Sequence, residues 1–283
     1  EREVPQGAIE GDYVSKTQPF PSKPAPLNPT YFDPDKAFGF TFWDRGHCKR
    51  TAKKLRNEGL FTPPSLQGSI HYPSGVGGNN WGGPAVDSKR NIMVVNTNNM
   101  ASLIVMIPRE DCTEPLEELS INKNQVRFTN IESNEGAPYC NLRSMGFFSP
   151  LGVPCTEPPW GTLTAVDLNT GEHLWNVPLG TSKDLAPFPF WWIKGAPNMG
   201  GPTVTASGVT FIGATSDHYL RAFNTETGEE IAKFRLPTGA HATPMTYTNK
   251  EGKQFVVIAA GGHWAIGTPA SDHLIAFALP KNN

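Results

Sequence analysis

The fold is decided by residues 200–236, which read GGPTVTASGVTFIGATSDHYLRAFNTETGEEIAKFRL. Four short runs, at 200–204, 209–213, 219–223 and 230–236, are separated by turn signals such as Thr-Gly. Runs of this length between turn residues are typical of short β-strands. The stretch therefore predicts a unit of four strands.

A second copy of this unit follows directly along the chain. Its strand candidates lie at 242–245, 255–259 and 274–278. The triplet Ser-Asp-His precedes the third strand in both copies, at 216–218 and again at 271–273. The close match indicates a structural repeat.

A third copy lies upstream and is interrupted. It begins at 82–86 and 92–95, resumes after a long insertion at about 108–160, and ends with 163–167 and 173–175. The last of these runs closes with Trp175, which we expect to pack between neighbouring copies because a large ring needs a flat partner surface.

The spacing of the copies identifies the architecture. Ala165, Ala222 and Ala276 occupy equivalent positions, 57 and 54 residues apart. A period in this range with four strands per unit predicts β-propeller blades, and hence an all-β fold. About three blades are visible, with a fourth partial one in the first 80 residues. A ring of typically four to eight blades then needs strands from elsewhere.

The domain organisation follows from the same pattern. Residues 1–68 are rich in Pro and Gly and predict an extended segment with a partial blade and one short helix, from Trp43 to about Asn57. Residues 69–283 predict the C-terminal propeller blades.

Composition excludes several classes of function. The formal net charge is −2, so no basic field is available to hold a phosphate backbone, and nucleic acid is not an expected partner. No apolar run reaches the length of a membrane span. The chain opens with Glu1-Arg2-Glu3, which is unlike a signal peptide. We therefore expect either a cytosolic protein or a mature or internal piece of a longer one.

The four cysteines, Cys48, Cys112, Cys140 and Cys155, match no zinc-binding spacing. Cys112 and Cys140 flank part of the poorly periodic insertion. Two interpretations are open: a disulfide that closes this loop in an oxidising compartment, or buried free thiols.

Several runs stand in the order found in one known family, and the sequence resembles the membrane-associated PQQ-dependent dehydrogenases of the glucose/quinate/shikimate group. The runs are VPQG at 4–7, TQPF at 17–20, FTPPSLQG at 61–68, NWGG at 80–83, FIGATSD at 211–217, LRAF at 220–223, ATPMTY at 242–247 and AAGGH at 259–263. They cover nearly the whole chain.

The resemblance implies part of an eight-bladed quinoprotein propeller in the bacterial periplasm, associated with the inner membrane through N-terminal helices that this sequence lacks. Pyrroloquinoline quinone (PQQ) and calcium lie near the propeller axis of that family. The implied activity is oxidation of a polyhydroxylated cyclic alcohol, either quinate or shikimate or an aldose such as glucose, by hydride transfer to PQQ, with electrons passing to ubiquinone.

The same resemblance places the catalytic base and the calcium ligands in upstream blades, so no catalytic residue and no metal ligand is assigned to this chain. The expected partner is the N-terminal half of the same propeller. The exact substrate stays open, as does the origin of the chain as a split subunit, a proteolytic product or part of a longer polypeptide.

Five residues are candidates for cofactor binding. By resemblance, Asn96 matches a cofactor-contacting asparagine at the end of a strand. Trp81 and Asn80 lie close to the same blade edge. PQQ is a planar tricarboxylate, which needs flat apolar surfaces and hydrogen-bond donors. For Trp81, packing between blades is the alternative interpretation.

Asp217 and His263 complete the candidate set. The family places an aspartate linked to cofactor binding or electron transfer at Asp217, while the repeat of this residue at Asp272 favours a turn aspartate that caps its own backbone. His263 follows a glycine pair, which suits a close approach of cofactor or substrate. Trp264 stands where the family usually has a small residue, and a bulky ring there can reshape the substrate mouth.

One aromatic stretch has no assigned role in this implied activity. Residues 187–192 read PFPFWW, which is either a loop packed on its own propeller or an exposed patch that contacts a membrane, the quinone or another subunit. Blade repeats alone also fit a non-catalytic propeller that serves as a scaffold or binding module. Asn96, the glycine pair and His263 favour the dehydrogenase.

Overall fold

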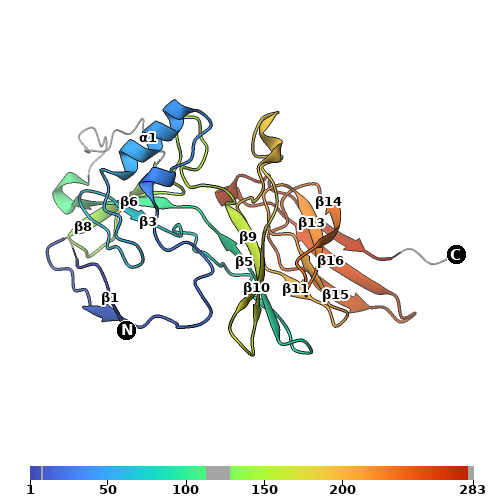
Figure 1. The fold of residues 1–283 in the computed structure, drawn as a ribbon. Helices are drawn as coiled ribbons and strands as arrows, with labels where there is room; N and C mark the ends of the chain where they lie inside the picture. The colour runs from blue at the N-terminus through green and yellow to red at the C-terminus, as the bar shows by residue number, and fades with distance from the viewer. Residues whose placement is uncertain (8, 113–127, 280–283) are drawn as a thin grey trace. The chain divides into compact units, whose positions relative to one another are not determined.

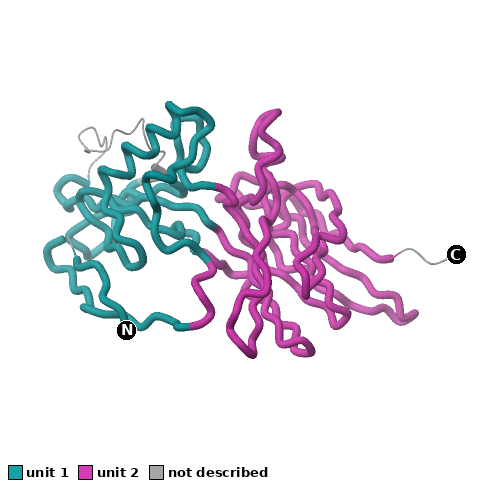
Figure 2. Tube along the Cα trace, viewed as in Figure 1, with its two compact units in different colours: residues 1–22, 28–77, 99–157 teal, residues 23–27, 78–98, 158–283 magenta. Residues whose placement is uncertain are grey.

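The structure is a computed structural model that describes residues 1–7, 9–112 and 128–279 (Figure 1). The chain divides into two compact units (Figure 2): unit 1 is residues 1–22, 28–77 and 99–157, and unit 2 is residues 23–27, 78–98 and 158–283. Short antiparallel strands dominate both units. Among the described residues, no helix combines the length and the apolar character that a transmembrane span requires.

The four-strand unit predicted from residues 200–236 is confirmed in unit 2. Its strands pair in chain order as one antiparallel sheet, β11-β12-β13-β14. They are β11 (Thr203–Val204), β12 (Val209–Ile212), β13 (Tyr219–Asn224) and β14 (Glu230–Arg235). Meandering four-stranded sheets of this kind are the blades of a propeller.

The interrupted upstream copy also forms one sheet, in the order β10-β9-β5-β4. Its strands are β4 (Ala85–Asp87), β5 (Ile92–Asn98), β9 (Gly161–Asp167) and β10 (His173–Pro178). The chain leaves this sheet after Asn98, earlier than the insertion expected at about 108–160, because residues 102–108 pair in a different sheet.

The C-terminal copy contributes three described strands in the order β15-β16-β17. These are β15 (Met245–Thr248), β16 (Gln254–Ala260) and β17 (His273–Phe277). The first strand was expected at 242–245 and begins only at Met245. Pro244 explains the shift, since proline lacks the N–H that a ladder needs.

The sheets of unit 2 stack through two apolar layers, which is how blades bury faces that they cannot bury alone. One layer joins the first two sheets through Ile92, Val94, Leu163, Ala165, Leu179, Ile212, Ala214 and Phe223. The next joins the last two through Leu220, Leu236, Ala240, Val256, Ile258 and Ala260. Trp175 packs between the first two sheets, as predicted, and its indole N–H donates to the Thr225 carbonyl at 3.0 Å.

Unit 1 contains a further four-stranded sheet, ordered β3-β6-β8-β7. Its strands are β3 (Ser69–His71), β6 (Ser102–Pro108), β8 (Tyr139–Ser144) and β7 (Phe128–Glu132). A partial blade was expected in the first 80 residues, and β3 is the strand that this region supplies. The other three come from the chain that interrupts the β4–β10 sheet. A two-stranded ribbon of β1 (Arg2–Glu3) and β2 (Thr17–Gln18) completes the strands described in unit 1.

The predicted short helix is α1 (Phe42–Ala52). It begins where the Thr41 hydroxyl accepts the Asp44 N–H at 3.1 Å, which satisfies one of the free amides of the first turn. The expectation that it continues to about Asn57 is wrong. The chain turns after Lys53, and Arg56 is extended and pairs with Ser69.

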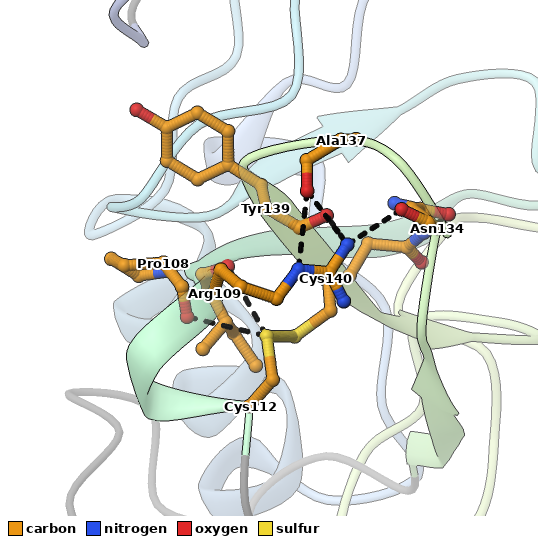
Figure 3. The surroundings of a disulfide bond; sticks show 9 residues. Pro108, Arg109, Cys112, Asn134, Ala137, Tyr139 and Cys140 are labelled. Atoms are coloured by element: carbon orange, nitrogen blue, oxygen red, sulfur yellow. Dashed lines mark hydrogen bonds between the residues drawn. A yellow bond between two sulfur atoms is a disulfide. The ribbon is translucent and has the colours of Figure 1, made fainter.

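Both pairs of cysteines form disulfides in unit 1, Cys48 with Cys155 and Cys112 with Cys140. The second is the pairing that the sequence left open against free thiols. Beside it, the Arg109 guanidinium donates to the carbonyls of Asn134 and Ala137, at 2.6 and 2.7 Å (Figure 3). These bonds fasten the turn before β8 to the end of β6.

Candidate functional site

The candidate site is built where the chain enters the three sheets of unit 2. Three equivalent segments lead into these sheets: WGGP at 81–84, MGGP at 199–202 and HATP at 241–244. The first two touch backbone to backbone. A Cβ built on Gly82 would lie 2.1 Å from the Gly201 nitrogen, and one on Gly201 would lie 2.3 Å from the Gly82 oxygen. Only glycine permits this approach.

Asn96 lies near the end of β5 and is only 1% exposed. Its Nδ2 donates to Asn198 Oδ1 at 2.6 Å and to the Gly200 carbonyl at 2.7 Å. Since both partners are acceptors, they fix which end of the Asn96 amide is nitrogen. Its Oδ1 is buried without a hydrogen-bond partner in the described part of the chain. This oxygen can therefore accept a hydrogen bond from an N–H or O–H group.

Asn198 holds this region together and was missed from the sequence. Its Nδ2 donates to the Thr97 carbonyl at 3.0 Å, and its backbone N–H donates to Asn98 Oδ1 at 2.8 Å. A signal for it existed, because Asn198 precedes MGGP as Asn80 precedes WGGP. Aligning the entry segments of the blades would have singled it out.

Trp81 presents an exposed ring, with 60% of its surface accessible. Its indole N–H donates to the His241 carbonyl at 3.4 Å, and its ring centroid lies 5.4 Å from that of His263. The side chain of Asn80 accepts the backbone N–H of Trp81 at 2.7 Å, so in this structure Asn80 shapes the turn before the ring.

His263 follows Gly262, which has a φ of +67° and no room for a side chain, since a Cβ there would lie 1.8 Å from the Pro269 oxygen. His263 is half-buried, and its Nδ1 accepts the Ala265 N–H at 3.2 Å. The proton of the neutral ring is therefore on Nε2. Its ring also stacks with Trp264, at a centroid distance of 5.8 Å and an interplanar angle of 21°.

His241 is the second residue that the sequence did not single out. It is 5% exposed, and its ring nitrogens contact the Ala214 carbonyl at 2.8 Å and Thr268 Oγ1 at 2.9 Å. Burial lowers the pKa of His241 to about 4, so the ring is neutral near pH 7. It occupies in HATP the position of Trp81 in WGGP, which is the signal that the repeat offered.

Four of the five predicted residues are joined by this set of contacts. Asn96 binds the Gly200 carbonyl, Gly200 lies against the His241 backbone, and His241 accepts the indole N–H of Trp81. The fifth, Asp217, takes no part in these contacts.

The family model for the β-propeller domain of PQQ-dependent glucose, ethanol and alcohol dehydrogenases matches residues 1–256. The chain belongs to this family. The β-propeller predicted from the repeats and the PQQ-dependent dehydrogenase family implied by the resemblance are both confirmed.

Relatives in this family are similar over the full chain. A quinoprotein glucose dehydrogenase from Escherichia coli is 41% identical over 100% of this chain and 35% of its own length. The quinoprotein glucose dehydrogenase A from Acinetobacter calcoaceticus is 38% identical over 100% and 35%, respectively. A quinate/shikimate dehydrogenase (quinone) from Acinetobacter baylyi is 37% identical over 99% and 35%. The chain spans about a third of the length of these relatives.

The side chains of Trp81, His263 and Asn96 meet part of what PQQ binding requires. The exposed Trp81 ring offers a flat apolar surface, and the Nε2–H of His263 offers a donor for an anionic oxygen. The buried Oδ1 of Asn96 fits an N–H or O–H and does not fit a carboxylate, because both would be acceptors. Within the described ranges, no group of three His, Cys, Asp or Glu side chains could hold a metal ion.

Asp217 fits the PQQ dehydrogenase site less well. Its carboxylate is 0% exposed and accepts five hydrogen bonds, from Thr215, Thr181 and Arg221. Burial raises the pKa of this carboxyl, but the Arg221 guanidinium together with the hydrogen bonds from Thr215 and Thr181 outweighs burial and holds the pKa below its usual value. Asp272, its equivalent in the next repeat, is exposed. The geometry favours a structural ion pair over direct cofactor contact.

The aromatic loop 187–192 lies apart from these contacts. Phe188 and Trp192 are strongly exposed, and Phe188 packs edge-on against Trp191 with ring centroids 5.4 Å apart. Within its own unit the loop thus presents an apolar surface, and its contact with a membrane, the quinone or another subunit stays a prediction.

Proposed function

We propose that this chain forms one wall of the cofactor site in a PQQ-dependent dehydrogenase that oxidises a polyhydroxylated cyclic alcohol. The observation that carries the proposal is the contact between the exposed Trp81 ring and His263, both held by His241, in a chain of this family. When bound, PQQ supplies the acceptor for the two electrons of the alcohol. Trp81 would lie against its ring plane, and His263 Nε2–H would donate to one of its oxygens.

The substrate is a quinate- or shikimate-like ring acid, or an aldose such as glucose. Relatives named for both classes are similar to this chain to nearly the same degree. The exposed indole of Trp264 stacks on His263 and narrows the approach to its ring. Each oxidation removes a hydride from carbon and a proton from the hydroxyl. The base that takes the proton and the ligands of the calcium ion lie in upstream blades, and ubiquinone is the final acceptor.

The site works in the periplasm, next to the inner membrane. The two disulfides support this location, because such bonds persist in oxidising compartments. The partner is the N-terminal part of the same propeller, and membrane attachment comes from segments outside this sequence. The relatives are about three times as long as the chain, which leaves room for both.

The test uses the full-length protein that carries this sequence, loaded with PQQ and Ca²⁺. Reduction of an artificial electron acceptor is followed with quinate, shikimate and glucose, and then with a soluble ubiquinone analogue. We expect one substrate class to be oxidised and the analogue to be reduced. A protein that binds no PQQ under conditions that load a known quinoprotein would instead support a non-catalytic propeller scaffold.

A further inference from the structure

The contacts of the His241 ring determine which of its two nitrogens donates a hydrogen bond and which one accepts. A carbonyl can only accept, so the contact with the Ala214 oxygen places the ring proton on Nδ1. Nε2 of the neutral ring is then an acceptor and receives the Thr268 hydroxyl proton across 2.9 Å. That proton has a second possible acceptor, the His263 carbonyl, but this oxygen is farther away, at 3.2 Å.

The Thr268 hydroxyl oxygen is left to accept, and the backbone N–H of His263 donates to it at 2.6 Å. Donors and acceptors therefore run in one direction, from His263 through Thr268 and His241 to Ala214. Thr268 is buried, so water does not replace these bonds readily. The His263 N–H also reaches the Thr268 carbonyl at 3.2 Å, and the Thr268 N–H reaches the His263 carbonyl at the same distance. The His241 ring therefore supports the His263 backbone by orienting the Thr268 hydroxyl beside this bridge.

The same residue also holds Trp81, through its backbone. The His241 carbonyl accepts the indole N–H of Trp81, and the His241 ring meets the His263 ring edge-on at a centroid distance of 6.4 Å. One buried side chain and its own carbonyl therefore set the relative placement of the two groups proposed to meet the cofactor.

We propose that His241 is a positioning residue, which holds His263 and Trp81 in the geometry that binds PQQ through its Nδ1–H tautomer and its hydrogen bond to Thr268. This inference rests on the proposed function. The low pKa of His241 is consistent with it, because the ring does not gain a second proton near pH 7 and the tautomer persists.

Four variants of the full-length protein test the proposal. Thr268→Val removes the hydroxyl and keeps the shape, whereas Thr268→Ser keeps the hydroxyl and serves as the matched control. His241→Asn keeps a donor for Ala214 but does not reach Thr268. The double variant, which combines Thr268→Val with His241→Asn, tests whether the two side chains act through one hydrogen bond.

Two readouts are needed. Hydrogen exchange of the peptide covering 261–270, measured without cofactor, reports the bond from the His263 amide, and a PQQ titration reports the Kd. We expect Thr268→Val and His241→Asn each to speed exchange and to raise the Kd about tenfold. Thr268→Ser should behave like wild type, and the double variant like either single one.

The outcomes separate the two claims. If the wild-type protein binds no PQQ, the proposed function fails, and this inference fails with it. If wild type binds PQQ but exchange quickens with no change in Kd, His241 is merely structural and the inference alone is overturned. Additive losses in the double variant overturn it too. Should Thr268→Val not fold, His241→Asn against wild type decides the matter by the same two readouts.

Discussion

The indole N–H of Trp81 donates to the backbone carbonyl of His241, 3.4 Å away, across 160 positions of sequence. Each residue opens the entry segment of its own blade, at the same place in the repeat. The repeat therefore puts different side chains at equivalent points, one exposed and one buried. Blades with similar backbones can therefore contribute chemically different side chains to one site.

Trp81 should contribute to PQQ affinity through both its flat ring and its indole N–H. We expect Trp81→Phe, which keeps a ring, to raise the Kd for PQQ by about 3- to 10-fold, because one hydrogen bond is lost. Trp81→Ala should raise it further, because the stacking surface is lost as well. A PQQ titration of the full-length protein measures both.

Trp192→Ala is the control for Trp81, since it removes another strongly exposed indole, from the loop at 187–192. Its Kd for PQQ should equal that of wild type. Equal losses in Trp81→Ala and Trp192→Ala would mean that Trp81 has no special place in the site.

Asp217 should be required for stability. In Asp217→Asn the buried Arg221 guanidinium loses the carboxylate to which it donates twice and keeps only the more exposed Glu230 as an ion-pair partner, so we expect a loss of about 3 kcal/mol of unfolding free energy. Urea unfolding of the full-length protein measures this loss. Asp272→Asn changes the equivalent residue of the next repeat, which is exposed, and should leave the unfolding free energy within about 0.5 kcal/mol of wild type.

A different result would reverse the assignment of Asp217. If Asp217→Asn keeps its unfolding free energy but loses affinity for PQQ, the carboxylate acts on the cofactor and the ion pair is incidental. The family-based interpretation of this aspartate would then replace the structural one.

The contrast between Asp217 and Asp272 shows what a repeat does and does not predict. Strands and turns recur with the repeat, because hydrophobic spacing and Gly-containing turns determine them locally, and the strands of 200–236 were predicted on that basis. The surroundings of the two aspartates do not recur. Arg221 has no counterpart beside Asp272, and only the folded sheet shows that it pairs with Asp217.

The candidate site was predicted in part for the same reason. Trp81, Asn96 and His263 stand out as residue types with chemistry at blade edges, and the structure joins them through shared contacts. Asn198 and His241, which make those contacts, were not found, because their roles depend on pairs about 100 and 160 residues apart. The sheet of β3, β6, β8 and β7 was predicted only as a partial blade in the first 80 residues, because one of its strands comes from before the interrupted blade and three from inside it.

Trp175 should stabilise the stacking of its blade on the next. Its ring lies against Gly228 and its N–H reaches the Thr225 carbonyl, so Trp175→Ala leaves a cavity and an unpaired carbonyl. We expect a loss of about 3 kcal/mol in unfolding free energy. Leu174→Ala, at the exposed neighbour on the same strand, should cost less than about 1 kcal/mol. Equal losses would show that Trp175 does not hold the blades together.

His241 should make the stability depend on pH between about 4 and 6.5. Burial lowers its pKa in the folded protein from 6.5 to about 4, so in this window the unfolded chain holds a proton that the folded protein does not. Stability then rises with pH, and the contribution of His241 is complete above about 6.5. It is lost as the pH falls toward 4, by about 3 kcal/mol in total. The charged forms of His263 and His218 nearby lower the pKa of His241 further.

His241→Asn isolates this contribution, because asparagine does not titrate. Urea unfolding of wild type and variant at pH 7.5 and pH 5 should show a smaller loss on acidification in the variant. A slope remains in both proteins, since burial also lowers the pKa values of His218 and His71. If wild type and His241→Asn lose equal stability between the two pH values, His241 is not held neutral. The hydrogen bond from Thr268 to its Nε2 would then not persist, because a protonated ring has no acceptor to offer.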